Sequence, residues 1–384
     1  MTAPYDPEDR EKVVSKLPST LRQELKVRAA QVGVDIKDAV TEGVQAWRVR
    51  TEPLPVVDTS GGDSFSTYLP TGLFGDFKVD CKTRGLSFTQ GLAQAITLWL
   101  STHPSPRRIP RPMGARRIIF ANQKGGVGKT ASSAGVAEGL AELGFRVLLV
   151  DFDPQGHLSR QLGYEMLGID EPSLAKHMLG EAKGDLRDLL VPIDGASFGG
   201  RLSLLPACRD AFLLDARLAT SRHVRVKETA LEKAMEPLEN DFDFVIVDCP
   251  PSLGYAMDTA LYYARTREGE DSNASGILVI VLAEDSSADA YDMLYDQIQD
   301  LTEDLDVDIT SLGFIVNMYD ARKGYIATSS LRSWTEIGDP PVLGVIPELK
   351  EQRQAVRLKR ALLVEYPDCE QSEVMRSIAR RITA

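Results

Sequence analysis

The sequence of 384 residues lacks the features of membrane-spanning and secreted proteins. Its longest apolar run, from Gly276 to Ala283, is far shorter than the roughly 20 residues that a membrane-spanning helix needs. The N-terminal residues MTAPYDPEDREK are too acidic for a signal peptide, so we expect a cytoplasmic protein. With 43% apolar and 26% charged residues, the composition excludes disordered and collagen-like chains and leaves room for two or three domains.

Cysteine is scarce as well. The four cysteines, Cys81, Cys208, Cys249 and Cys369, lie far apart and form no C-x-x-C pair. This spacing argues against a zinc ribbon, an iron–sulfur site and a disulfide framework. We therefore expect four isolated, reduced thiols.

A strongly basic character is also absent, since the formal net charge is −12. The charge is uneven: residues 1–117 carry 17 Lys and Arg against 13 Asp and Glu, and the remainder carries 27 against 43. The overall charge disfavours the wrapping of DNA, but it leaves room for a local basic face.

Proline and arginine gather in one stretch, residues 101–117, which holds four prolines and five arginines without helical or strand periodicity. Such a composition predicts a stiff, extended, basic linker. We expect a flexible N-terminus over residues 1–10, a small and mainly α-helical domain over 11–100, a linker over 101–116 and a second domain over 117–384.

The first domain contains an internal repeat. Sliding the sequence by 52 positions lays residues 13–21 over residues 65–73 and brings Trp47 onto Trp99 without a gap. Each copy has a short extended segment that ends in Leu-Pro, then a helix, a glycine break, and an amphipathic helix that ends in tryptophan. One copy alone cannot bury its apolar face. The copies span residues 12–50 and 64–100.

This order of strand, helix and helix resembles the ribbon-helix-helix fold, in which two units pair their strands into a ribbon that lies in the major groove of DNA. The tandem arrangement allows an intramolecular pseudo-dimer whose alternate strand residues face the bases. The implied DNA-facing residues are Lys12, Val14, Lys16, Ser64, Ser66 and Tyr68. The alternative is a duplicated helical hairpin for dimerisation or docking, because this region is near neutral and specific DNA-binding domains normally carry a basic surface.

Strongly β-prone runs alternate with helical stretches through the second domain. This alternation is typical of βαβ units, so we expect an α/β fold with a mostly parallel sheet covered by helices on both faces. Ligands of such sheets bind at the carboxyl ends of the strands. The expected strands are residues 117–121, 146–152, 202–206, 244–248, 277–282, 312–317 and 342–346.

The strongest motif is Lys124-Gly-Gly-Val-Gly-Lys-Thr130, which follows a strand and precedes an expected helix over residues 131–143. Its glycines allow backbone N–H groups to surround phosphates, while Lys129 supplies a positive charge and the Thr130 hydroxyl can ligate Mg²⁺. The motif predicts a P-loop, and hence a P-loop NTPase fold. Two acidic strand ends later in the chain strengthen this prediction.

Carboxylates end two of the apolar strands. Asp151 and Asp153, in the sequence Val150-Asp-Phe-Asp-Pro-Gln155, are alternate residues and are expected to point the same way. Two like charges in a buried place are costly unless a Mg²⁺–phosphate centre or an attacking water engages them. Asp248 ends four apolar residues as a Walker B aspartate does, which predicts that it holds the metal through water.

Together the three motifs resemble those of the ParA/Soj family of DNA-partitioning ATPases, with deviant Walker motifs, from about Arg116 to near the C-terminus. The Asp-Pro-Gln sequence favours this family over the similar cell-division ATPase MinD, and the lack of paired cysteines argues against nitrogenase iron protein. The resemblance implies ATP and Mg²⁺ as cofactors. It implies a nucleotide site made of Lys124, Gly125, Gly126, Val127, Gly128, Lys129, Thr130 and Ala131, with Asn317 and Pro347 near the adenine.

The resemblance also implies roles for single residues. Lys124 would reach the nucleotide of the partner subunit in an ATP-sandwich homodimer, Lys129 would bind phosphates, and Asp153 would position the attacking water. These three are the implied catalytic residues, and hydrolysis is expected to be slow until a partner completes the site. The implied metal-binding residues are Thr130, Asp151 and Asp248.

Partners follow from the same resemblance. A ParB-like centromere-binding protein would stimulate hydrolysis, and the ATP dimer would hold non-specific DNA of the nucleoid through basic residues. The candidates here are Arg353, Arg357, Lys359 and Arg360, for which a solvated helix face is the alternative. The amphipathic residues 372–382 are expected to form a closing helix packed on the sheet and not a membrane anchor.

The sequence thus favours an ATPase that segregates a plasmid or chromosome and whose N-terminal repeat binds operator DNA for autoregulation. Two alternatives are a positioning ATPase for a non-DNA cargo and a transcriptional repressor whose ATPase only sets its oligomeric state. Salt-sensitive, ATP-dependent binding to random DNA would favour partition, whereas nucleotide-independent binding to one operator would favour repression.

Overall fold

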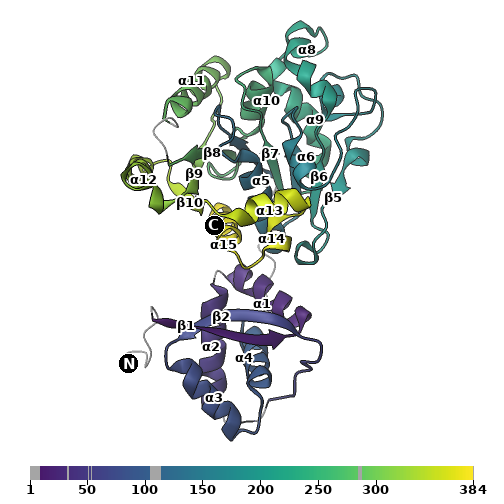
Figure 1. Ribbon diagram of the computed structural model, residues 1–384. Coiled ribbons are helices and arrows are strands. Elements are labelled where there is room, and N and C mark those ends of the chain that lie inside the picture. The colour runs from purple at the N-terminus through teal and green to yellow at the C-terminus, as the bar shows by residue number, and fades with distance from the viewer. Residues whose placement is uncertain are drawn as a thin grey trace. The chain divides into compact units, whose positions relative to one another are not determined.

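The computed structural model describes residues 9–32, 34–50, 52, 54–103, 114–283 and 288–383. The chain divides into two compact units, residues 1–110 and 111–384, which are treated separately below (Figure 1). Most of the expected linker, residues 104–113, and residues 1–8 of the expected N-terminal segment lie outside the described residues.

The first unit pairs the two copies of the repeat within one chain. Strand β1 of the first copy runs antiparallel to strand β2 of the second, with Val14 opposite Ser66. Because these two positions are also equivalent in the repeat, an approximate two-fold axis passes between them. The elements are β1 (Arg10–Leu17), α1 (Ser19–Val32), α2 (Ile36–Val49), β2 (Asp63–Pro70), α3 (Leu73–Thr83) and α4 (Phe88–Thr102).

The tryptophan contacts obey the same symmetry. Trp47 Nε1 donates to Gln94 Oε1 (3.1 Å), and Trp99 Nε1 donates to Glu42 Oε2 (2.9 Å). Positions 47 and 99 are equivalent in the repeat, and so are positions 42 and 94. Each copy therefore offers a tryptophan to the other copy, and both rings are buried in the shared core.

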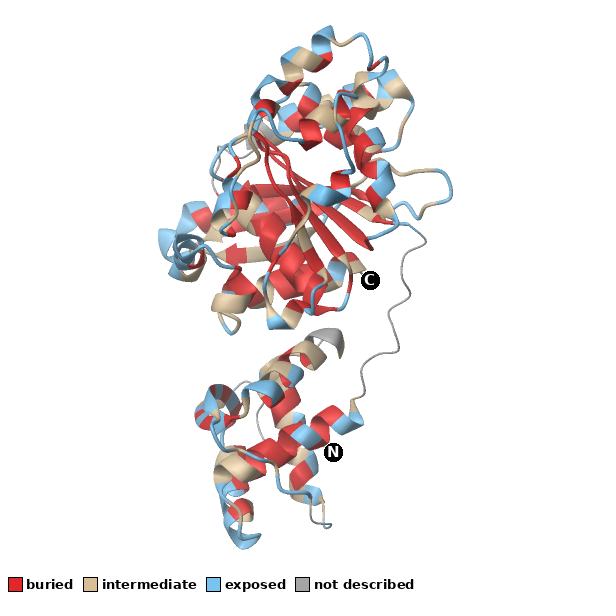
Figure 2. Ribbon diagram, turned by 90° about the vertical axis from the view of Figure 1, so that its right-hand side faces the viewer, coloured by how far each residue is buried: buried red, intermediate tan, exposed pale blue. Residues whose placement is uncertain are grey.

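Alternate strand residues of β1 and β2 divide into a buried and an exposed set, as the period of a β-strand requires (Figure 2). The buried set, which includes Val13, Leu17, Phe65 and Leu69, belongs to the core of the unit. The ribbon thus has one face in the core and one exposed face. The exposed set consists of the residues expected to face outward: Lys12, Val14, Lys16, Ser64, Ser66 and Tyr68.

Both ends of the repeat extend beyond the expected boundaries. Strand β1 begins at Arg10, and α4 includes Ser101 and Thr102, which were expected in the linker. The hydroxyls of these two residues donate to Leu98 O in the preceding turn of the helix. The first proline of the stretch stands only at position 104, so nothing in the sequence breaks the helix earlier.

The second unit is built on an eight-stranded sheet in the order β10-β9-β8-β3-β7-β4-β6-β5. Neighbouring strands are parallel except the short edge strand β5, which runs antiparallel to β6. The expected parallel α/β architecture is confirmed, and β5 was not expected. The strands are β3 (Arg116–Ala121), β4 (Val147–Asp151), β5 (Val191–Pro192), β6 (Leu202–Leu205), β7 (Phe244–Asp248), β8 (Gly276–Leu282), β9 (Ser311–Tyr319) and β10 (Val342–Pro347).

Helices cover both faces of this sheet (Figure 1). One face forms a continuous apolar core with α7 to α12, and α5 and α15 cover the other. The helices are α5 (Lys129–Glu142), α6 (His157–Gln161), α7 (Leu174–Met178), α8 (Leu214–Thr220), α9 (Ala230–Glu239), α10 (Tyr255–Tyr263), α11 (Ala288–Leu305), α12 (Tyr325–Ile337), α13 (Lys350–Leu358), α14 (Leu362–Glu365) and α15 (Glu370–Thr383).

Helix α15 packs on α5 and β10, as expected for a closing helix. Its residues Met375, Ile378 and Ile382 are buried. A Cβ atom on Gly135 of α5 would lie 2.6 Å from Met375 Cγ, so this glycine permits the close approach of the two helices. Within the described ranges, no helix combines the length and the apolar character that crossing a membrane requires.

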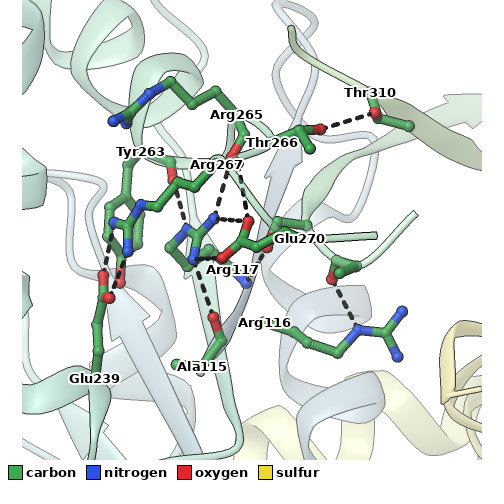
Figure 3. A network of polar contacts seen from close by, with 12 residues as sticks. Ala115, Arg116, Arg117, Glu239, Tyr263, Arg265, Thr266, Arg267, Glu270 and Thr310 are labelled. Atoms are coloured by element: carbon green, nitrogen blue, oxygen red, sulfur yellow. Dashed lines mark hydrogen bonds and ion pairs between the residues drawn. The ribbon is translucent and has the colours of Figure 1, made fainter. Parts of the chain in front are cut away.

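Ion pairs fasten the start of β3, at the end of the sheet opposite the carboxyl ends of its strands (Figure 3). Arg117, only 1% exposed, makes a two-pronged ion pair with Glu270 and donates from Nε to Tyr263 O. Arg267 makes a second two-pronged pair, with Glu239. These contacts fix the first strand of the unit where the chain enters it.

Candidate functional site

The P-loop, residues 122–128, joins β3 to α5. Gly126 and Gly128 have φ angles of 76° and 92°, in the region that favours glycine. Asn122 anchors the loop, because its Nδ2 donates to Ile280 O (2.6 Å) and its Oδ1 accepts from Lys124 N (2.8 Å). Helix α5 then begins at the loop, and its free N-terminal N–H groups offer a site for phosphate.

Lys129 folds back over the loop that precedes it. Its Nζ donates to Lys124 O (3.3 Å), and the residue is 7% exposed. Burial lowers the pKa of the ammonium group, while the nearby carboxylates of Asp248 and Asp153 raise it. A partly desolvated ammonium group at this place would interact strongly with an anion.

Asp151 and Asp248 lie side by side where β4 and β7 end, as register partners on adjacent strands. They are 3% and 1% exposed. Burial is the main cause that raises the pKa of both groups, that of Asp151 to about 6. The charge of Asp153 raises the pKa of Asp151 further, and the charge of Asp151 raises that of Asp248. Asp151 Oδ2 accepts from the N–H and the hydroxyl of Ser159 (2.7 and 2.6 Å).

Three carboxylate oxygens remain without a hydrogen-bond partner among the described residues: Asp151 Oδ1 and both oxygens of Asp248. Buried and unpaired carboxylates are unusual and require a cation or donors. The Thr130 hydroxyl at the start of α5 contacts Asp248, so the three side chains form an oxygen-rich donor set that suits Mg²⁺. Among the residues that the structure describes, no cluster of three His, Cys, Asp or Glu side chains could hold a metal ion.

Asp153 has a different environment from Asp151. It lies in the loop after β4, where its Oδ1 accepts from Gln155 N (2.8 Å). It lines the cavity beside the P-loop, whereas Asp151 is held by Ser159 below it. The two aspartates were expected to point the same way, but β4 ends at Asp151 and the strand alternation stops there.

The cavity beside the P-loop has a volume of about 620 Å³, within the range of small-ligand sites. One wall consists of P-loop residues and the start of α5. A second wall comes from Asp153, Gln155 and α6, and a third from Arg357 and Lys359 at the end of α13. The P-loop wall is made by Gly125, Gly126, Gly128, Lys129, Thr130 and Ala131.

The two residues expected near the adenine do not belong to the described lining of this cavity. Asn317 is buried, and its Nδ2 donates to Val127 O (2.7 Å), so it supports the P-loop from below. Its Nδ2 would lie 1.9 Å from a Cβ on Gly128, which therefore has no room for a side chain. Pro347 O accepts from Gln371 Nε2 (3.0 Å) at the end of β10.

The four basic residues expected at DNA divide into two pairs. Arg357 and Lys359 line the cavity beside the P-loop. Arg353 is paired with Glu348 (2.7 Å) and Arg360 with Glu365 (2.9 Å), although their side chains are 70% and 63% exposed. Surface pairs of this kind are weak, so both guanidinium groups can exchange partners.

Sequence reasoning missed several residues of the site. Ser159 fixes Asp151, and Asn122 fixes the backbone at Lys124. Gln155, His157 and Gln161 line the cavity without having been expected there. The position of Gln155, His157 and Gln161 ten residues or fewer after Asp151 was a usable signal, because the loop after an acidic strand end borders the ligand of such sheets.

Comparison with families of known proteins gives a match over half of the chain. A family model described as an AAA domain matches residues 115–309. The chromosome-partitioning ATPase Soj of Thermus thermophilus is 30% identical over 269 residues, which cover 70% of this chain and 96% of the relative. The family match falls on the second unit and ends before β9, so it leaves out the last two strands and the helices that follow.

Solved structures show the same architecture. Cobyrinic acid a,c-diamide synthase from Mycobacterium smegmatis, with bound ADP and magnesium, is 28% identical with a TM-score of 0.52, over 69% of this chain and 93% of that one. The ATP complex of Cyanothece McdA(D38A) has a TM-score of 0.57 at 18% identity, over 70% and 96%. The likeness to McdA concerns the fold alone.

Proposed function

Because the chain belongs to the ParA/Soj/MinD family of P-loop ATPases, we propose that it binds and slowly hydrolyses ATP beside residues 122–128 and uses this cycle to partition DNA. One observation carries the proposal. The P-loop and Asp153 line the same cavity, next to two buried aspartates with unpaired oxygens. This arrangement has a place for phosphates, for a divalent cation and for the water that attacks.

Different residues of the site would bind the metal, bind the phosphates and orient the attacking water. Mg²⁺ bound with the nucleotide supplies positive charge against the developing negative charge of the phosphates. Thr130 and Asp248 would hold it, with Asp151 Oδ1 as a further oxygen. Lys129 and the N–H groups at the start of α5 bind phosphates, and Asp153 orients water. Lys124 would reach the nucleotide of a second copy in an ATP-dependent homodimer.

Helix α13 supports a link between nucleotide and DNA. Its C-terminal end carries Arg357 and Lys359 on the cavity and, one turn or less away, the exposed Arg353 and Arg360. A nucleotide that contacts the first pair would fix the end of the helix and with it the second pair. Binding of non-specific DNA through phosphate contacts would then depend on ATP. A ParB-like centromere-binding protein would stimulate hydrolysis and release the DNA.

For the first unit we propose a ribbon-helix-helix domain that binds operator DNA. The open face of the β1–β2 ribbon supports this role, because it carries side chains of alternating strand positions that could enter the major groove. Its two halves differ. The first copy contributes Lys12 and Lys16, and the second contributes Ser64 and Tyr68, so the operator would have two unlike halves.

The test measures binding of the full chain to random and to own-promoter DNA with ATP, ADP or no nucleotide, over a series of salt concentrations. We expect salt-sensitive binding to random DNA with ATP only. Lys129→Ala should lose it because nucleotide binding fails, whereas Lys183→Ala, an exposed lysine far along the sequence, should keep it. Lys12→Ala/Lys16→Ala should lose only the preference for the promoter. ATP hydrolysis without any binding to DNA would instead favour a positioning ATPase with another cargo.

A further inference from the structure

The loop after β7 connects the buried Asp248 to α10. It comprises residues 249–254 and begins where Cys249 N donates to Phe120 O (3.3 Å) on the neighbouring strand β3. Two prolines follow at positions 250 and 251, and proline fixes the φ angle of the backbone. Pro251 lines the nucleotide cavity. The position of this loop therefore affects both the border of the cavity and the backbone next to Asp248.

Helix α10 begins at the far end of this loop without a capping side chain of its own. Its N-cap residue is Gly254, which has no side chain to accept from the free N–H groups of the first turn. Asp215, at the start of α8, supplies the missing acceptor, because its Oδ1 accepts from Ala256 N (2.7 Å). Ala256 is the second residue of α10, a position whose N–H a capping side chain ordinarily satisfies. A residue 41 positions earlier in the sequence thus caps α10.

The Asp215 carboxylate also explains why the N-cap residue is glycine. A Cβ atom on Gly254 would lie 2.3 Å from Asp215 Oδ2 and 2.8 Å from its Cγ. The φ angle of Gly254 is −89°, which residues with side chains also adopt, so the backbone conformation does not require glycine. Glycine is needed here because the carboxylate occupies the space of a side chain.

A second contact fixes the first turn of α10 from another direction. Asp258 Oδ1 accepts from Gln297 Nε2 (2.7 Å) on α11. The turn is therefore held by α8 and by α11. Because the loop of residues 249–254 is also fixed at Cys249, both of its ends are tied to elements of the fold.

We propose that Asp215 is a positioning residue of the nucleotide site, which by capping α10 holds the loop of residues 249–254 and through it Pro251 at the cavity and Asp248 beneath it. Asp215 is not part of the described lining of the cavity, so it acts through the backbone of the loop. The capping of α10 is independent of the proposed function, whereas the effect on hydrolysis rests on it.

The first test measures hydrogen exchange of the full-length protein without nucleotide, in peptides that contain residues 249–257. Asp215→Ala removes the acceptor, whereas Asp215→Asn keeps an oxygen for Ala256 N. Asp185→Ala is the matched control, because Asp185 Oδ1 also accepts from a backbone N–H at a helix start, that of Arg187 (2.9 Å). We expect exchange that is about fivefold faster or more in Asp215→Ala, the usual scale of losing a helix cap, and wild-type exchange in Asp215→Asn and the control.

Gly254→Ala tests the same contact from the other side. Its methyl group would push the carboxylate away from Ala256 N, so exchange and hydrolysis should resemble those of Asp215→Ala. In Gly254→Ala/Asp215→Ala the methyl group has room, so the double variant should be no more impaired than Asp215→Ala alone. Effects of the two substitutions that multiply independently would overturn the proposal.

Hydrolysis and nucleotide affinity distinguish positioning from a general loss of structure. We expect Asp215→Ala to lower kcat about tenfold or more, because small displacements at a reacting centre are costly. Affinity for a fluorescent ATP analogue should stay within about twofold of the wild type, since the P-loop belongs to another segment. Asp215→Asn should recover most of kcat.

Exchange or kcat equal to the wild type in Asp215→Ala, or the absence of rescue in Asp215→Asn, would overturn the proposal. A wild type that does not bind the analogue would contradict the proposed function, and hydrogen exchange alone would then decide whether Asp215 holds the loop.

Discussion

Asp151 and Asp248 are opposite each other at the ends of β4 and β7, but Asp151 accepts two hydrogen bonds from Ser159, whereas the side-chain donor beside Asp248 is the Thr130 hydroxyl. The pair is thus chemically unequal. Asp151 fixes α6 beneath the cavity and has one oxygen to spare, whereas Asp248 presents two. A cation bound with a nucleotide would relieve the repulsion between the two groups, so nucleotide and metal should bind cooperatively.

Asp153→Ala should preserve ATP binding and stop hydrolysis. The carboxylate lines the cavity and holds Gln155 N, so its loss removes the group that orients water while the phosphate-binding P-loop remains. We expect a fall of about 100-fold or more in turnover, the usual effect of losing such a group. Phosphate release measures it, and exposed Asp300→Ala is the control. Turnover equal to the wild type would show that Asp153 has another role.

Lys124→Ala should impair the ATP-dependent dimer and leave binding of ATP by the monomer. The loop backbone at this position is held by Asn122 Oδ1, which does not depend on the lysine side chain. Light scattering with a slowly hydrolysed ATP analogue measures the dimer, and equilibrium titration measures the affinity. A variant that forms dimers at the concentration of the wild type would refute the contact across subunits.

Glu138→Gln should make stability less dependent on pH. Burial raises the pKa of Glu138 to about 8 from an ordinary value of 4.5. Between these values the folded state keeps a proton that the unfolded state has lost, so stability falls as pH rises through this window and is level above it. Glutamine can accept the same bond from Leu363 N (2.8 Å) without ionising.

The gain in melting temperature of Glu138→Gln over the wild type should therefore be larger at pH 8 than at pH 5. The same gain at both values would mean that the carboxyl is not held neutral in the fold. Thermal scans at constant ionic strength suffice for this comparison.

Arg376→Met should destabilise the packing of α15 on α5. Arg376 and Glu142 form an ion pair of 2.6 Å with side chains only 5% and 4% exposed. Removal of one partner leaves a buried charge, which costs about 3–5 kcal/mol. Glu142→Leu/Arg376→Met should recover much of the loss. Hydrogen exchange of α15 measures both, and equal protection in Arg376→Met and the wild type would contradict the expectation.

The features that could be predicted from the sequence depend on patterns within a short stretch of residues. The glycines and lysines of the P-loop, the apolar strands and their terminal aspartates are all read within a few residues, and the structure places them at one edge of one sheet. The repeat could also be recognised from the sequence, because equivalent apolar residues and tryptophans of the two copies are all 52 positions apart.

The features that the sequence did not predict depend mostly on contacts between distant segments. Asn317 supports Val127 across 190 positions, so its place under the loop has no local signature. Arg353 of α13 pairs with Glu348, which lies five positions earlier in the loop before the helix. Ion pairs that the sequence of a helix predicts are three or four positions apart, so this pair was not expected. Strand β5 is two residues long and too short for any periodicity.

The pairing of β1 with β2 has a final consequence. Most two-fold ribbons need two molecules to meet, so dilution separates them. Here both halves are covalently joined by residues 18–62, and the ribbon forms at any concentration, even from a single copy per cell. The halves are also free to diverge by mutation one at a time, since a change in one is not repeated in the other.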